Sequence, residues 1–227
     1  PPSSTARLDH RPARTLVREP AGLAGRGGPA DAGGGALTGP AAAGLSEQDR
    51  VAVSAQLGRR PRGLRAVAHR CPCGLPDVVE TSPRLEDGTP FPTLYYLTCP
   101  RAAAAVGRLE AAGVMREMTA RLAADEALAE AYARAHRDYV ARREVLGHVP
   151  EIAGVSAGGM PDRVKCLHVL AAHALAAGPG VNPLGDETLA AVGAWWGGGP
   201  CVEATVTDSA RLLESAAGAG AATEAVR

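Results

Sequence analysis

The sequence predicts an α+β fold, a single helix-rich domain with a small antiparallel sheet near its N-terminal end, flanked by disordered tails. Three observations lead to this prediction. Residues 1–44 and 203–227 have too few large apolar side chains to offset their chain entropy. Short β-like runs occupy 64–99, and helical patterns follow from 101. We therefore expect a disordered arm at 1–44, one domain at 45–202 and a disordered tail at 203–227.

Local signals predict the elements in order. Ser46, followed by Asp49 three residues later, predicts an N-capped helix that ends at Gly58. Strands are expected at 65–69, 77–81 and 93–98, where Pro and Gly separate β-like runs. The remaining helices are expected at 101–112, 114–123, 125–146 and about 162–177, with a short last helix that carries Leu189, Trp195 and Trp196.

The charge balance excludes some classes of partner. The chain has 24 basic and 24 acidic residues, and a neutral chain lacks the basic field that general binding to nucleic acid or anionic membranes needs. No apolar run approaches the roughly 20 residues of a membrane span. Residues 1–16 lack the apolar core of a signal peptide. We therefore expect a cytoplasmic protein whose five cysteines are reduced thiols.

The first candidate site is a cysteine cluster. Cys71 and Cys73 lie in a turn rich in Pro and Gly, and Cys99 follows the last predicted strand. Thiolates on such turns converge on zinc at about 2.3 Å, and iron–sulfur clusters use the same ligands. The alternative is that these cysteines are small buried core residues.

The second candidate site precedes the helix expected at 162–177. Gly158 and Gly159 would leave backbone N–H groups free to bind an anion at a helix start, and Arg163 and Lys165 would add charge. Lys165 is the only lysine in the chain, which favours a functional role. The alternative is a flexible loop followed by an ordinary capped helix with solvated basic residues.

Cys166 is the strongest candidate for a reactive thiol. Its expected position near a helix N-terminus, beside a lysine, favours the thiolate. On a regular helix, residues two apart point about 200° away from each other, so we expect Cys166 and His168 to diverge. The candidate bases for Cys166 are His168 and His69, and because of this divergence His69 would have to fold close to the thiol. Asn182 is a candidate ligand-binding residue, although an Asn-Pro pair is also ordinary turn chemistry.

Four motifs together resemble a known family. HRCPCGLPDVVET, FPTLYYLTCP, GGMPDRVKCLH and GVNPLGD, at residues 69–81, 91–100, 158–168 and 180–186, are similar to a bacterial, actinobacterial family of unknown function, domain of unknown function 501. The resemblance covers about 46–202. It implies no known reaction, and variation at the positions of Cys73 and Cys99 among relatives argues against an obligatory four-cysteine cluster. Gene neighbours of such relatives suggest cell division or phosphate metabolism.

These observations leave three functional hypotheses open. The leading one is a thiol or metal site centred on Cys71 and Cys166, with Cys73, Cys99 and His168 as partners, beside a site for an anionic small molecule. Zinc is the preferred metal, ahead of an iron–sulfur cluster. The second hypothesis is an enzyme that uses Cys166 to act on a phosphorylated small molecule. The third is a non-catalytic adaptor for a division or envelope protein.

Overall fold

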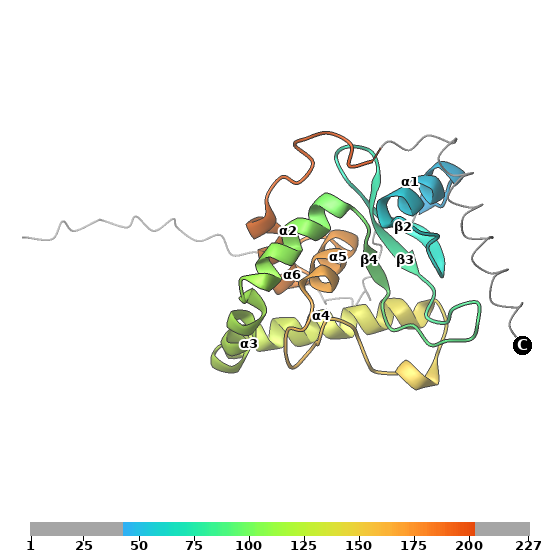
Figure 1. Cartoon of the computed structure of the whole chain (residues 1–227). Coiled ribbons are helices and arrows are strands. Elements are labelled where there is room, and N and C mark those ends of the chain that lie inside the picture. Colours follow the sequence, from blue (N-terminus) through green and yellow to red (C-terminus); the bar gives the residue numbers. More distant parts are fainter. Residues whose placement is uncertain (1–42, 203–227) are drawn as a thin grey trace, which may run out of the picture. The chain divides into compact units, whose positions relative to one another are not determined.

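An antiparallel sheet and six α-helices make up residues 43–202, the part of the chain that the computed structural model describes (Figure 1). The strands are β1 (Ala43–Gly44), β2 (Leu64–Arg70), β3 (Pro76–Thr81) and β4 (Tyr95–Leu97). The helices are α1 (Glu47–Leu57), α2 (Pro100–Ala111), α3 (Val114–Ala124), α4 (Glu126–Val145), α5 (Leu167–Ala177) and α6 (Pro183–Val192), and a 3₁₀ helix, η1, spans Pro150–Ile152. The predicted α+β class is confirmed.

The sheet has the order β1-β2-β3-β4, and all neighbouring strands are antiparallel. Three of its strands lie where the sequence predicts them. β4 is shorter than the run expected at 93–98, because the N–H of Leu94 donates to the hydroxyl of Tyr139 at 2.6 Å and α2 begins at Pro100. β4 is therefore a short edge strand, held at its start by α4 and followed directly by a helix.

Helices cover both faces of the sheet around β4. Tyr95 is buried, and its ring stacks on His173 of α5 with centroids 6.0 Å apart. Tyr96 points to the opposite face, as the alternation of a strand requires, and lines a cavity together with Leu57 of α1. In Figure 1 the sheet accordingly lies between α1 and the group formed by α2, α5 and α6.

The long helix α4 buries the face that the sequence predicts. Tyr132, Ala135 and Tyr139 are fully buried in the core, while Leu128 packs against its margin. Arg143 lies on the same face and is only 1% exposed, which apolar periodicity does not predict. Its guanidinium donates to backbone carbonyl oxygens of the loop that contains η1. A buried cation is tolerated there because it has acceptors for its N–H groups.

The helix start expected near residue 162 was wrong, because α5 begins at Leu167. The preceding segment folds back on itself instead. The N–H of Lys165 donates to the carbonyl of Gly158 at 2.7 Å, and the N–H of Arg163 donates to that of Gly159 at 3.1 Å. Both glycines have positive φ, 74° and 94°, a conformation that side chains with Cβ adopt rarely. Residues 158–165 therefore form turns, and α5 cannot begin before them.

Two other expectations concern the ends of the predicted domain. The last helix was expected to reach Trp195 and Trp196, but α6 ends at Val192, before Gly193. The predicted disordered arm and tail lie outside the described residues, apart from β1 at the end of the arm. Within residues 43–202, no helix is long and apolar enough to cross a membrane.

The contact between α5 and α6 provides a stability test. A Cβ at Gly185 would collide with the carbonyl oxygen of Leu170 and lie 2.8 Å from the Cβ of Ala174. Overpacking of this kind costs about 1–3 kcal/mol, so we expect Gly185→Ala to lower the free energy of unfolding by that amount. Gly107 of α2 has nothing within 4 Å, and Gly107→Ala should raise stability by about 0.5–1 kcal/mol. Urea unfolding of both variants checks this, and equal effects would contradict the packing.

Candidate functional site

The N-terminus of α5 brings together Cys166 and His168, which were expected to point apart on a regular helix. Cys166 is the N-cap of this helix, with extended backbone angles of φ −155° and ψ 112°. His168 is the second residue of the helix proper. The divergence expected for this pair assumed that both residues are helical, and it was wrong because the extended N-cap turns the thiol toward the imidazole. The Cys166 thiol and a ring nitrogen of His168 lie within 4.8 Å of each other.

Glu110, on α2, completes this group. Its Oε1 accepts the N–H of Leu167 at 2.7 Å and lies 3.1 Å from Nδ1 of His168. The carboxylate therefore caps α5 from another helix, since the first N–H groups of a helix lack partners within it. Sequence reasoning missed Glu110 because it lies more than fifty positions away from the thiol and belongs to no motif. No signal in a single sequence connects the two segments.

The geometry of the three side chains suits a metal ion. The ligand atoms of Glu110, Cys166 and His168 all lie within 4.8 Å of one another. Two ligands bound to one zinc ion at about 2.0–2.3 Å are at most about 4.6 Å apart, so small side-chain rotations would bring the three atoms onto an ion. Nε2 of His168 lies 3.0 Å from the carbonyl oxygen of Ala103. A donor bond there fixes the ring and leaves Nδ1 free to bind a metal.

The same surroundings favour the imidazolium in the metal-free protein. The hydrogen bond to Cys166 and the carboxylate of Glu110 raise the pKa of His168 to about 9, against the lowering effect of burial. Both ring nitrogens then carry protons, one facing Glu110 and one facing the carbonyl of Ala103. A metal cation bound at Nδ1 would thus replace a proton, and the carboxylate of Glu110 that stabilises the imidazolium would also stabilise the cation.

A groove opens beside the thiol and the imidazole. Its volume is ≈ 660 Å³, and it is bordered by α1, β4, the start of α2 and the start of α5. Cys166 and His168 line one side, while Gln56 of α1 and Tyr96 of β4 line another. The candidate site is therefore open to a small ligand rather than enclosed in the core.

The other cysteines do not join this group. Within residues 43–202, Glu110, Cys166 and His168 are the one set of three ligand side chains that converge, so Cys71, Cys73 and Cys99 form no three-ligand cluster there. Burial raises the pKa of Cys71 to about 12 and that of Cys99 to about 11, which keeps both thiols protonated. These two resemble the small core residues of the alternative interpretation.

His69 has a different partner from the one that the sequence suggested. Its Nδ1 lies 2.7 Å from Oδ1 of Asp77, a fully buried carboxylate on the neighbouring strand. No described contact joins His69 to Cys166. His69 therefore stands within the sheet, and the imidazole beside Cys166 is that of His168.

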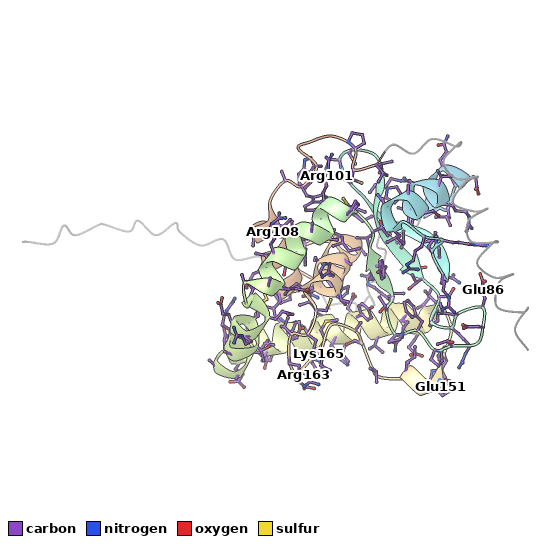
Figure 2. The ribbon with its side chains drawn as sticks, in the orientation of Figure 1. Glu86, Arg101, Arg108, Glu151, Arg163 and Lys165 are labelled. Carbon is purple, nitrogen blue, oxygen red and sulfur yellow. The ribbon has the colours of Figure 1, made fainter. Side chains whose placement is uncertain are left out.

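The residues proposed to bind an anion occupy two different settings. Arg163 and Lys165 are exposed on the loop before α5, where Figure 2 labels them next to each other. Gly158 and Gly159 shape that loop. Asn182 is fully buried, and its Oδ1 accepts the N–H of Gly185 at 2.9 Å as the N-cap of α6. The anion site stays a prediction for the exposed loop, and Asn182 lies in the core instead.

The raised pKa of His168 predicts how stability depends on pH in the metal-free protein. A group whose folded pKa exceeds its unfolded value stabilises fully below about 6.5, and this stability is lost as pH rises through about 9. We therefore expect His168→Gln to lower the unfolding midpoint clearly at pH 6 and far less at pH 10. Urea unfolding of chelator-treated protein measures this. The exposed His148 offers a control, and an equal loss for His168→Gln at both pH values would contradict the imidazolium.

Comparison with known proteins identifies the family of this chain and gives no further relative. No curated protein and no solved structure shows significant similarity to the chain. A family model described as "Protein of unknown function (DUF501)" matches residues 67–190, which include part of β2, all of β3, β4 and α2 to α5, and all three side chains of the candidate site. The match covers more than half of the chain, and the protein therefore belongs to the DUF501 family.

Proposed function

We propose that this protein binds a zinc ion through Glu110, Cys166 and His168. The observation that carries the proposal is the convergence of a thiol, an imidazole nitrogen and a carboxylate oxygen within 4.8 Å. These three ligand types are those that zinc sites use, and the two anionic ligands balance the charge of the ion. Magnesium and calcium prefer oxygen ligands alone, so the thiol and the imidazole favour a softer metal.

Zinc suits the site better than an iron–sulfur cluster does. Such clusters are held by several cysteine thiolates, and the group contains one. No other cysteine thiol converges with this group among residues 43–202. The proposal differs from the site expected from the sequence, which was centred on Cys71 and Cys166 with Cys73, Cys99 and His168 as partners: it keeps Cys166 and His168 and adds Glu110.

Three protein ligands leave one position of a tetrahedral ion for a ligand. Structural zinc sites use four protein ligands, whereas sites that bind substrate keep one position open. Cys166 and His168 line the groove of ≈ 660 Å³, so the open position would face it. The proposal therefore describes a ligand-binding zinc site rather than a structural one.

A second candidate is a thiol-dependent enzyme. Cys166 lies at a helix N-terminus, within 4.8 Å of a ring nitrogen of His168, and a cysteine beside a histidine is the arrangement of a thiol nucleophile and its base. A phosphorylated small molecule as its substrate stays a prediction.

The adaptor hypothesis has less support, because Val145 and Val155 are the exposed large apolar side chains among the described residues, too few for a large patch.

Zinc titration of chelator-treated protein tests the proposal. We expect one zinc ion per chain in competition with a chromophoric chelator. Cys166→Ser and Glu110→Gln should each weaken binding at least about tenfold, because each replaces a ligand by a poorer one. Glu110→Gln keeps an oxygen that can accept the N–H of Leu167, so the cap on α5 is retained.

Cys73→Ser is the matched control, since Cys73 is a half-buried thiol outside the group. It should bind zinc as tightly as the unmodified protein. Zinc binding that survives in Cys166→Ser but is lost in Cys73→Ser would contradict the proposal and restore the cluster predicted from the sequence. Circular dichroism of each variant, recorded first, separates a lost ligand from a lost fold.

A further inference from the structure

A serine and a histidine form a second polar pair, on the side of α4 that faces the loop after η1. The Oγ of Ser156 lies 2.8 Å from Nδ1 of His136. The two residues are twenty positions apart and meet because the loop folds back along α4. A hydroxyl within hydrogen-bond reach of an imidazole is the arrangement in which histidine acts as the base for a serine nucleophile.

The protonation state of His136 suits this role. Burial lowers its pKa, opposed by the carboxylate of Asp162 and assisted by the nearby positive charges of Arg137 and Arg143. The ring is therefore neutral at pH 7, and its Nδ1 can accept the proton of the hydroxyl. The hydroxyl also lies 3.2 Å from the carbonyl oxygen of Met160, which gives its proton a second acceptor in the resting state.

The backbone around Ser156 is held in place by a buried cation. Arg143 donates to the carbonyl of Val155 and, at 2.7 Å, to that of Ile152. It is 1% exposed and lies about two helical turns from His136 on α4. One helix thus fixes both the loop with the serine and the histidine beside it, as preorganised catalysis requires.

Two backbone N–H groups follow Ser156 by two and three positions in the sequence. Gly158 and Gly159 have positive φ, and their carbonyls are engaged by Lys165 and Arg163. Their own N–H groups meet no acceptor among residues 43–202. Free N–H groups in such a turn can stabilise an oxyanion. The anion-binding role that the sequence suggested for these glycines thereby gains a specific form.

We propose that Ser156 and His136 form a nucleophile and base that accept a small acyl group from an ester, with the N–H groups of Gly158 and Gly159 facing the developing oxyanion. The Oγ of Ser156 bonds to the acyl carbon, its proton passes to Nδ1 of His136, and the ester bond breaks as the alcohol leaves with that proton. Water then adds to the acyl carbon, and the carboxylic acid departs while Ser156 regains its proton.

We expect the acyl group to be small, because little of Ser156 is exposed. Ser156 is 9% exposed, whereas the next residue back, Val155, is 55% exposed, so the hydroxyl lies just below the surface. The residues around it spell G-x-S-x-G, from Gly154 to Gly158. That pattern usually places serine between a strand and a helix, which is not the case here, so the contact with His136 carries the inference and the pattern does not.

Labelling with a fluorophosphonate probe, read by intact mass and peptide mapping, tests this pair. We expect the full chain to gain one label on Ser156 and to hydrolyse p-nitrophenyl acetate. Ser156→Ala should abolish the label, and His136→Gln should slow labelling at least 100-fold. Ser54, whose hydroxyl donates to the carbonyl of Arg50 with no histidine contact, provides the control variant Ser54→Ala, which should label normally.

Three results of the labelling experiment would show that Ser156 and His136 do not act as nucleophile and base. No label on the folded chain, a label on another residue, or a rate unchanged in His136→Gln would each overturn the inference. Because Ser156→Ala could disturb the loop, Ser156→Cys serves as a second variant: it keeps a nucleophile at that position and should react with iodoacetamide faster than it does in the double variant with His136→Gln. Equal rates in those two variants would also overturn the inference.

Discussion

The bond between the Glu110 carboxylate and the first N–H of α5 is the interaction on which the candidate site depends. It joins α2 to α5 across 57 positions of sequence at a distance of 2.7 Å. The same oxygen lies beside Nδ1 of His168, so one side chain both caps the helix and orients the imidazole. Cys166 then needs only its extended N-cap conformation to join them. A helix start normally requires a capping group, and here the capping carboxylate is also one of the three proposed metal ligands.

The fold could be predicted where local patterns decide it. The capping box formed by Ser46 and Asp49 marks the start of α1, and both of its bonds are present. The buried face of α4 follows helical spacing through Tyr132 and Tyr139. Such features depend on residues within one or two turns of each other, and a single sequence contains all the information that they need.

Predictions failed where distant residues decide the structure. The helix start near residue 162 was wrong because Gly158 and Gly159 fold the following residues back onto their own carbonyls. Arg143 was not expected in the core, since its acceptors lie on a loop that becomes its neighbour only after folding. Glu110 belongs to this class as well, and its importance becomes visible only when α2 and α5 pack together.

The candidate site was predicted in part. Cys166 was singled out as a residue near a helix N-terminus, and that position is confirmed. Its pairing with His168 was considered unfavourable on helical geometry that does not apply to an N-cap. The turn with Cys71 and Cys73 was predicted to bind a metal because its cysteine spacing resembles that of metal knuckles. Spacing within the turn does not determine whether Cys71 lies near Cys166 in space. A sequence pattern identifies residue types that can bind a metal, whereas tertiary packing decides which of them meet.

The proposed zinc site is tested most directly by identifying the atoms that coordinate the bound metal. X-ray absorption spectroscopy of the zinc-loaded protein counts sulfur neighbours separately from nitrogen and oxygen neighbours. For zinc bound by Glu110, Cys166 and His168 we expect one sulfur at about 2.3 Å and the remaining ligands, nitrogen or oxygen, at about 2.0–2.2 Å. Two or more sulfur ligands would show that the cysteines of the turn hold the metal, and would contradict a site built from Glu110, Cys166 and His168.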